Sequence, residues 1–382
     1  MFEESERPTF GELPEDLVRD LLSQSLSLAG GLRKNLADLK SHIEVVRAEL
    51  EPIKVDRDVI STTVPTSCGV DGSYLVERLL STDLAAYAAL AIEGITPPSE
   101  RRHWPAPKHH AKVVALLHNE STQQMARGLM MCQELILARQ APHDVVMLDW
   151  GFRTPQIFLN NATSNFKKCK SADLRGELTK SLPEALDVYL EVAQGRRSEK
   201  VYVGAPKYST LTELTEGLTT PTSFDDRTLA TLVLKPGEFL GPFQIQSTED
   251  VSESHIEIPK EIVQDYPDLP KLRDQVLDAV KGAQVLYYKP RPYLPAMRLE
   301  VAKRHTADVP LGTLLRAIEF QCAAPGVFEP FPLYLADRMV KHLPGAFPAF
   351  LQAVTHEMAS EYKGDVGEVF LAMHSYRSEG GR

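Results

Sequence analysis

Two short apolar segments of this sequence are each followed directly by an aspartate. Residues 68–70 (Cys-Gly-Val) precede Asp71, and residues 145–148 (Val-Val-Met-Leu) precede Asp149. Short runs that contain β-branched valine are typical of buried strands rather than of amphipathic helices. An aspartate just after such a run is expected at the carboxyl end of its strand, where open α/β sheets hold their ligands. The two segments therefore predict an α/β fold with a pair of carboxylates at one edge of its sheet.

A pair of carboxylates on neighbouring strands can share divalent cations, because Mg²⁺ and Mn²⁺ prefer oxygen ligands. A helix is predicted over residues 119–140, shortly before the second aspartate, and it carries Glu134 as the expected third carboxylate. Glu120, at the start of this helix, is an alternative, although an acid there also complements the helix dipole. This set of residues indicates metal-assisted cleavage of a phosphodiester.

The composition narrows the class of protein. The 382 residues are 43% hydrophobic and 25% charged, which is typical of globular proteins. No segment approaches the roughly 18 apolar residues of a membrane span, and the acidic N-terminus lacks the layout of a secretion signal. The 4 cysteines form no CxxC pair, so neither a zinc site nor disulfides are expected, and a cytoplasmic setting is predicted. A net charge of −10 argues against a uniformly basic nucleic-acid-binding protein, but a nuclease needs only a local basic stripe.

The chain divides into three predicted parts. Residues 1–58 form an N-terminal helical extension, in which Gly30-Gly31 is expected to separate two helices. Leucines spaced by three and four residues after these glycines indicate either packing on the same chain or contact with a second copy or a partner. Residues 59–345 form the catalytic core, with an insertion around 245–280, and residues 346–382 form a C-terminal helix and a flexible tail from Ser375.

Within the core, the apolar patterns predict strands, helices and one loop. Strands are expected at 64–70, 74–80, 84–92, 145–148 and 201–204, and an antiparallel pair at 285–289 and 297–301. A loop is expected at 97–107, and helices at 174–192, 229–234, 311–320, 333–342 and 347–358. Asp225 or Asp226 is the expected N-cap of the 229–234 helix.

Basic residues in three places are candidates for contact with nucleic acid. The 97–107 loop combines Arg101, Arg102 and Trp104, which could follow a strand by phosphate contact and base stacking; alternatively, the tryptophan packs onto the core and the loop is merely solvated. Lys207 follows the 201–204 strand and can reach a phosphate as a point charge. The predicted hairpin and the residues after it are the most basic structured stretch, with Lys289, Arg291, Arg298 and Arg304 as candidate DNA contacts.

The order of these motifs resembles the NurA nuclease family. The resemblance covers roughly residues 60–345 and rests on Val-Asp-Gly-Ser at 70–73, the glutamate helix before Val-Met-Leu-Asp at 146–149, Val-Gly-Ala-Pro-Lys at 203–207, Arg-Leu-Glu at 298–300 and Pro-Phe-Pro-Leu-Tyr-Leu-Ala-Asp at 330–337. It implies a ribonuclease-H-like mixed β-sheet flanked by helices. It also implies Mn²⁺- or Mg²⁺-dependent DNA cleavage, typically as a 5′-to-3′ exonuclease with single-strand endonuclease activity. Members of the family form homodimers and process linear duplex ends and single strands with HerA, a hexameric translocase ATPase, which suggests a role in repair or antiviral defence.

For the site, the resemblance implies water attacking in line between two cations about 4 Å apart. Asp71 is expected to bridge both ions, Asp149 and Glu134 to complete one site, and Asp337 to complete the other. Lys207 and Arg298 neutralise the scissile phosphate, and Glu300 orients Arg298.

Two departures from the family pattern leave other functions open. Trp150 follows Asp149 where the family usually has glycine, and Asp337 stands where the family often has histidine. A catalytically impaired adaptor that docks on the ATPase is therefore one alternative. An actin-like phosphotransferase is another, although the sequence lacks a second Asp-x-Gly-Gly phosphate loop.

Overall fold

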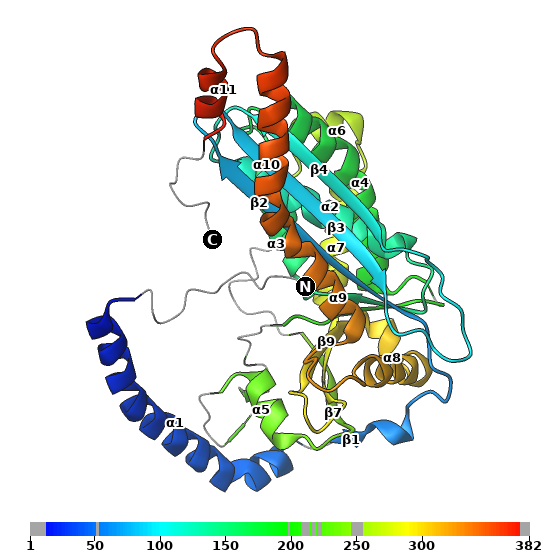
Figure 1. Cartoon of the computed structure of the whole chain (residues 1–382). Coiled ribbons are helices and arrows are strands. Elements are labelled where there is room, and N and C mark those ends of the chain that lie inside the picture. The colour runs from blue at the N-terminus through cyan, green and yellow to red at the C-terminus, as the bar shows by residue number, and fades with distance from the viewer. Residues whose placement is uncertain are drawn as a thin grey trace.

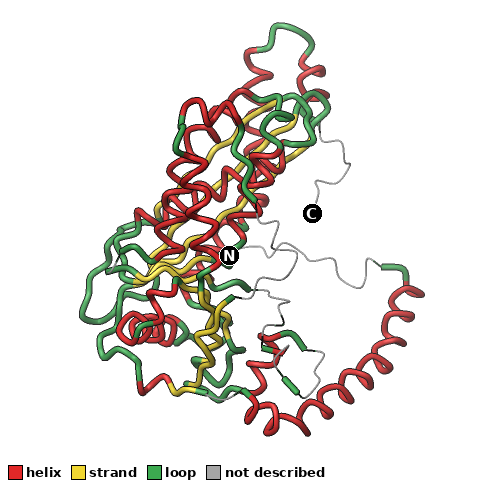
Figure 2. Tube along the Cα trace, turned by 180° about the vertical axis from the view of Figure 1, so that it is seen from behind, coloured by secondary structure: helices red, strands yellow, loops and turns green. Residues whose placement is uncertain are grey.

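The computed structural model describes residues 13–374, apart from 51–52, 198, 208–211, 213, 216–217, 220–223 and 246–254. The described residues form one nine-stranded mixed sheet covered by helices on both faces (Figures 1 and 2). The strands follow the order β1-β7-β8-β9-β6-β5-β2-β3-β4. Their bounds are Lys54–Val55 (β1), Ser67–Arg78 (β2), Asp83–Glu93 (β3), Lys108–Leu116 (β4), Val145–Leu148 (β5), Val201–Gly204 (β6), Glu238–Gln244 (β7), Gln284–Lys289 (β8) and Met297–Val301 (β9).

The strands β2, β5 and β6 run parallel, and all other neighbours in the sheet pair antiparallel. On one face α2 packs on β2 and β3, with α3, α4 and α7 beyond it, while α8, α9 and α10 cover the other face. The helices are Glu15–Glu49 (α1), Thr122–Gln140 (α2), Thr154–Ser164 (α3), Ala172–Gln194 (α4), Asp226–Val233 (α5), Lys260–Asp265 (α6), Leu269–Lys281 (α7), Asp308–Gln321 (α8), Phe331–Val340 (α9), His342–Glu361 (α10) and Val366–Ala372 (α11).

The burial of β5 on both faces explains its uninterrupted apolar run. Val146 and Leu148 pack into the core beneath α2 and α4, whereas Val145 and Met147 pack into the core beneath α8. Successive side chains of a strand point to opposite faces, so a strand between two helical layers needs an apolar residue at every position. The same argument holds for β6, and the strands predicted at 145–148 and 201–204 are confirmed.

The prediction of separate strands at 64–70 and 74–80 is wrong. A single strand, β2, runs through Asp71-Gly72-Ser73 and pairs with β3 from Cys68 to Arg78. An Asp-Gly pair is more often found in a hairpin turn, but here the ladder to β3 continues past it. Parallel pairing with β5 does end at Val70. Asp71 therefore lies in the middle of its own strand, yet at the carboxyl end of the parallel part of the sheet.

The N-terminal extension is one helix rather than two. The helix α1 continues through Gly30 and Gly31, where an added Cβ atom would meet nothing within 4 Å beyond the helix itself. Only the carboxyl-terminal end of α1 approaches the rest of the described chain, where Val46 packs with Leu229 and Val233 of α5, and the remainder curves away from the sheet (Figure 1). Two exposed glycines cost the helix about 2 kcal/mol of propensity, which alone does not break it.

The hairpin of β8 and β9 and the later helices are confirmed, and Asp225 is the N-cap of α5. The elements β1, β4, β7, α3, α6, α7 and α11 were not anticipated. The Ser375 tail and part of the 245–280 insertion lie outside the described residues, and the division into three parts stays a prediction. No described helix combines the length and the apolar character needed to cross a membrane.

Candidate metal centre

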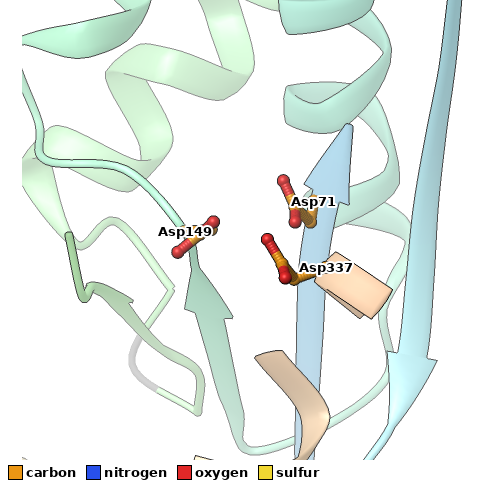
Figure 3. A group of neighbouring side chains, drawn as sticks. All are labelled: Asp71, Asp149 and Asp337. Atoms are coloured by element: carbon orange, nitrogen blue, oxygen red, sulfur yellow. The ribbon is translucent and has the colours of Figure 1, made fainter. Parts of the chain in front are cut away.

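Three aspartates converge where the parallel strands end. Asp71 comes from β2, Asp149 follows β5, and Asp337 comes from α9, which crosses the sheet at this point (Figure 3). Each offers one carboxylate oxygen, and these oxygens lie within 4.8 Å of one another. Asp149 lies 78 positions after Asp71 in the sequence and Asp337 lies 266 positions after it, yet their carboxylates meet. The predicted convergence of Asp71, Asp149 and Asp337 agrees with this geometry, while their role as metal ligands stays a prediction.

The close approach of α9 to β2 brings Asp337 to Asp71. Gly69 and Asp71 point to the same face of β2, because they are two residues apart. A Cβ atom on Gly69 would lie 2.5 Å from the backbone carbonyl carbon of Pro332. The first turn of α9 therefore rests directly on the backbone of β2, and the second turn places Asp337 over Asp71.

A lysine ammonium lies among these carboxylates. Lys207 follows β6, and its Nζ is 2.6 Å from Asp337 Oδ1, 3.2 Å from Asp149 Oδ2 and 3.3 Å from Glu329 Oε2. Glu329 belongs to the loop before α9 and is half-buried. We call Asp71, Asp149, Glu329 and Asp337 the acidic cluster. The cluster offers carboxylate oxygens as ligands and already surrounds the positive charge of the Lys207 ammonium. Its residues therefore fit a hard divalent cation.

Burial and crowding of like charges shift the pKa values in the acidic cluster. Burial raises the pKa of Asp71 to about 6. Burial and then the charge of Asp71 raise the pKa of Asp149 to about 7. Burial alone would lower the pKa of Lys207, but Asp149 and the other carboxylates outweigh it and raise that pKa. Asp71 and Asp149 are thus poised to exchange protons for a cation near neutral pH.

The third predicted carboxylate, Glu134, lies on the opposite face of β2. Its side chain is 2% exposed, and its Oε2 accepts a hydrogen bond from Trp150 Nε1 at 2.8 Å. A Cβ on Gly72 would lie 2.4 Å from Glu134 Oε1, so a glycine is needed beside this carboxylate. Burial and the charge of Asp71 raise the pKa of Glu134 well above its usual value. The charges of Asp71 and Asp149 thus act on Glu134 through the sheet, and its role as a ligand stays a prediction. Glu120, the alternative, is exposed just before α2.

Arg298 is held beside the cluster by a buried network. Arg298 is 1% exposed. Its guanidinium donates to Glu300 Oε1 at 2.8 Å and to the Tyr287 hydroxyl at 2.5 Å. Glu300 Oε2 also accepts the backbone N–H of Phe152 at 2.7 Å. The expected pairing of Glu300 with Arg298 is therefore present. Arg298 lines a cavity of about 250 Å³ that Lys207 and Glu329 also line.

The predicted DNA-contacting residues fall at two ends of the sheet. Lys207, Lys289, Arg291 and Arg298 lie toward the end that carries Asp149, because β9 begins where β6 ends. The loop with Arg101 and Arg102 and the turn with Arg304 lie at the opposite end, where β2 and β6 begin. Their contact with DNA stays a prediction.

The prediction that Trp104 stacks on DNA bases is wrong. Trp104 is 8% exposed and packs edge-on against His143, with ring centroids 4.8 Å apart. Its backbone N–H donates to the buried Glu93 carboxylate at 3.1 Å. The alternative reading, a tryptophan that packs onto the core, is the one that the structure bears out.

Two residues of the site were missed by sequence reasoning. Glu329 stands between Phe328 and Pro330 in a stretch without periodicity, and the signal available was its position eight residues before Asp337 on the approach to the same helix. Arg227 of α5 lines the same cavity, and its guanidinium donates to the backbone carbonyls of Lys207 and Ala296. Arg227 thereby fixes the backbone that carries the Lys207 ammonium.

The fold defines the class of protein. Three antiparallel strands (β4, β3, β2) continue into two parallel strands (β5, β6), helices cover both faces, and acidic residues gather at the junction of β2 and β5, which is the ribonuclease-H-like arrangement. The predicted fold class is confirmed.

Among solved structures, the chain is similar to NurA. Over 92% of this chain and 99% of the other, it matches the NurA nuclease from Sulfolobus solfataricus with a TM-score of 0.57 and 11% identity. Over 90% of this chain and 99% of the other, it matches a structure of NurA with manganese, with a TM-score of 0.50 and 15% identity. These matches confirm the predicted resemblance at the level of the fold. No protein-family model matches the chain, and no curated protein matches its sequence.

Proposed function

We propose that this protein is a Mn²⁺- or Mg²⁺-dependent deoxyribonuclease. The observation that carries the proposal is the convergence of oxygens from Asp71, Asp149 and Asp337 within 4.8 Å of one another. Support comes from the fold, which is that of a NurA nuclease, and from the manganese named with one of the similar structures. The substrate is DNA, as linear duplex ends or single strands.

In this proposal the aspartates hold the cations and the basic residues hold the substrate. Asp71, Asp149 and Glu134 would hold one cation, and Asp71 and Asp337 would hold the other. When bound, the cations supply Lewis-acid stabilisation and lower the pKa of water. The ammonium of Lys207 contacts the scissile phosphate, and the buried charge of Arg298 stabilises negative charge in the adjoining cavity. Carboxylates with pKa values near neutrality can release their protons as the cations bind.

The finer features of the proposal follow the resemblance to NurA. The cleavage is that of a 5′-to-3′ exonuclease and single-strand endonuclease in the cytoplasm. Its partner is a HerA-type hexameric translocase ATPase, and its role is the processing of DNA ends in repair or antiviral defence. The Lys207 ammonium already lies between Asp149 and Asp337, where a catalytic cation would bind. This position favours a second candidate function, a non-cleaving adaptor that docks on the same ATPase.

An assay on end-labelled linear DNA separates these two functions. The nuclease is expected to degrade both duplex and single-stranded DNA when Mn²⁺ is added and to stop when a chelator is in excess. The order of label release from the two ends reports the polarity. An absence of cleavage at every Mn²⁺ concentration, together with a stable complex with the ATPase, would instead support the adaptor.

Replacing Trp150 with phenylalanine is expected to weaken Mn²⁺ binding about tenfold. The indole N–H holds the buried Glu134 carboxylate at 2.8 Å, and loss of a partner that orients a metal ligand typically costs 10- to 100-fold in affinity, as an order of magnitude. Isothermal titration calorimetry measures the change. Trp104→Phe is the matched control, because Trp104 packs at the opposite end of β5. Equal affinity in Trp150→Phe and wild type would remove Glu134 from the ligand set.

The exposed face of α1 is proposed as the homodimer contact. Leu17, Leu21, Leu28 and Leu32 are each at least 45% exposed, so this part of the helix carries apolar surface that the described chain does not cover. Leu21→Glu combined with Leu28→Glu is expected to halve the mass measured by light scattering, because charges in an apolar interface are costly. The control is Arg33→Glu on the same helix. A mass that stays the same in the leucine variant would contradict a dimer formed through α1.

A further inference from the structure

Lys207 is bound by three parts of the acidic cluster at once. Its Nζ contacts Asp337 at 2.6 Å, Asp149 at 3.2 Å and Glu329 at 3.3 Å, and its positive charge also acts on Asp71. Isolated surface lysines contact one carboxylate and exchange freely with water. This ammonium is less than a quarter exposed and is surrounded by acids from β2, β5, α9 and the loop before α9. It lies where the carboxylate oxygens converge, which is where a divalent cation would also bind.

Asp337 has both of its oxygens engaged by lysines. Oδ1 is contacted by Lys207 and Oδ2 by Lys341 Nζ at 2.7 Å. A cation that uses Asp337 Oδ1 must therefore displace the Lys207 ammonium. Asp71 has no lysine within ion-pair distance among the described residues, and Asp149 shares one oxygen with Lys207. Asp71 and Asp149 therefore keep carboxylate oxygens that no described lysine contacts, and a first cation can use these oxygens.

The charge balance of the acidic cluster also favours a single divalent cation. Its four carboxylates carry four negative charges when ionised, and the two lysines that contact it carry two positive charges. The two negative charges that remain are balanced by one divalent cation. A second divalent cation would leave a buried excess of positive charge unless Lys207 moved away or a phosphate arrived.

A cavity beside the acidic cluster can receive the Lys207 side chain when its ammonium leaves Asp337. The cavity of about 250 Å³ that adjoins the cluster is lined by Lys207 itself, by Glu329 and by Arg298. Glu329 already contacts the ammonium from the side of this cavity. A lysine side chain is long and has several rotatable bonds, so it can leave Asp337 and keep Glu329 without movement of the backbone.

We propose, on the basis of the nuclease function above, that Lys207 is a resident cation that occupies the second of the two cation positions while DNA is absent. The DNA-free protein then binds one Mn²⁺, between Asp71 and Asp149. The second cation binds only when Lys207 moves from Asp337 toward Glu329 or a substrate phosphate. Lys207 thereby couples full occupancy of the metal centre to the presence of substrate.

The number of Mn²⁺ ions bound to the DNA-free protein tests the proposal. Electron paramagnetic resonance and calorimetric titration at physiological ionic strength are expected to give one ion per chain for wild type. Lys207→Met, which removes the charge but keeps much of the side-chain volume, is expected to give two ions per chain, with the spectral broadening of a coupled pair. Lys207→Arg keeps the charge and is expected to stay at one. Circular dichroism in excess Mn²⁺ verifies that each variant is folded.

The outcomes distinguish this inference from the nuclease proposal. Two ions bound to wild-type protein without DNA would overturn the inference and leave the nuclease function in place; this result does not depend on the folding of any variant. One ion bound to a folded Lys207→Met variant would also overturn it. No Mn²⁺ bound to wild type, with no cleavage of DNA, would reject both proposals.

Discussion

Replacing Asp149 with asparagine is expected to abolish Mn²⁺-dependent degradation of linear DNA while the protein stays folded. Asp149 ends β5 and supplies one of the three converging carboxylate oxygens. A bound cation contributes several kcal/mol of charge stabilisation, and about 4 kcal/mol corresponds to about a thousandfold in rate. A loss of at least that size is expected in the assay on end-labelled DNA. Asp278→Asn, on an exposed position of α7, is the matched control. Activity retained by Asp149→Asn would contradict the assignment.

The same substitution is expected to stabilise the metal-free protein at pH 8. Burial and the charge of Asp71 raise the pKa of Asp149 to about 7, above the value of about 3.9 in an unfolded chain. For a raised pKa, the stabilisation from the bound proton is complete below the unfolded value and is lost as the pH rises through the folded value. The advantage of the asparagine variant should therefore grow between pH 4 and 8. Urea unfolding in the presence of a chelator measures it, and a variant less stable than wild type at pH 8 would mean that the lost ion pair with Lys207 matters more than burial.

Gly69→Ala is expected to damage both stability and metal binding. The added methyl group would lie 2.5 Å from the backbone of Pro332, and backbone cannot move aside as a flexible side chain can. Overpacking of this kind costs about 1 to 3 kcal/mol, and relief requires that α9 move away from β2. That movement carries Asp337 away from Asp71, so we expect weaker binding of Mn²⁺ together with a lower midpoint of thermal unfolding.

Gly176→Ala is the control for this change. Gly176 lies in α4 with nothing within 4 Å of the added methyl group, and alanine is favoured over glycine in a helix by up to about 1 kcal/mol. The control should match or exceed wild type in stability and bind Mn²⁺ normally. If Gly69→Ala behaved in the same way as Gly176→Ala, the direct contact between α9 and β2 would not be what positions Asp337.

Much of the central sheet could be predicted because its strands obey a simple pattern. Every side chain of β5 is buried, so the run Val145–Leu148 stands out from its surroundings. The juxtaposition of Asp71 and Asp149 followed from two such runs, since parallel neighbours end at the same edge. Asp337 came from the ordered motifs rather than from periodicity, and its position depends on the contact of α9 with Gly69.

Other elements carried weaker or misleading signals. Asp71-Gly72-Ser73 interrupts the apolar pattern of β2, although pairing with β3 continues through it. The outer strand β4 exposes His109, His110 and most of its other residues, so it lacks the apolar alternation that marks a half-buried strand. Whether a helix survives two glycines depends on small differences in free energy, and α1 does survive them.

The contacts within the site were the least predictable part. The burial of Trp104 depends on His143, which lies 39 positions away, and the hydrogen bond from Trp150 to Glu134 joins the segment after β5 to α2. The three carboxylates around Lys207 come from distant segments, and one of them, Glu329, has no motif of its own. Such contacts are set by tertiary packing, which local patterns do not encode.

The most direct test of the metal centre is the binding of Mn²⁺ to the wild-type protein and to a variant with both Asp71→Asn and Asp149→Asn. Titration of free Mn²⁺, followed by its paramagnetic resonance signal, reports binding without reference to cleavage. The wild type is expected to remove Mn²⁺ from solution, and the folded double variant is expected to bind at least a hundredfold more weakly, because two anionic oxygen ligands are lost. Equal binding by the two proteins would show that these aspartates do not form a metal site.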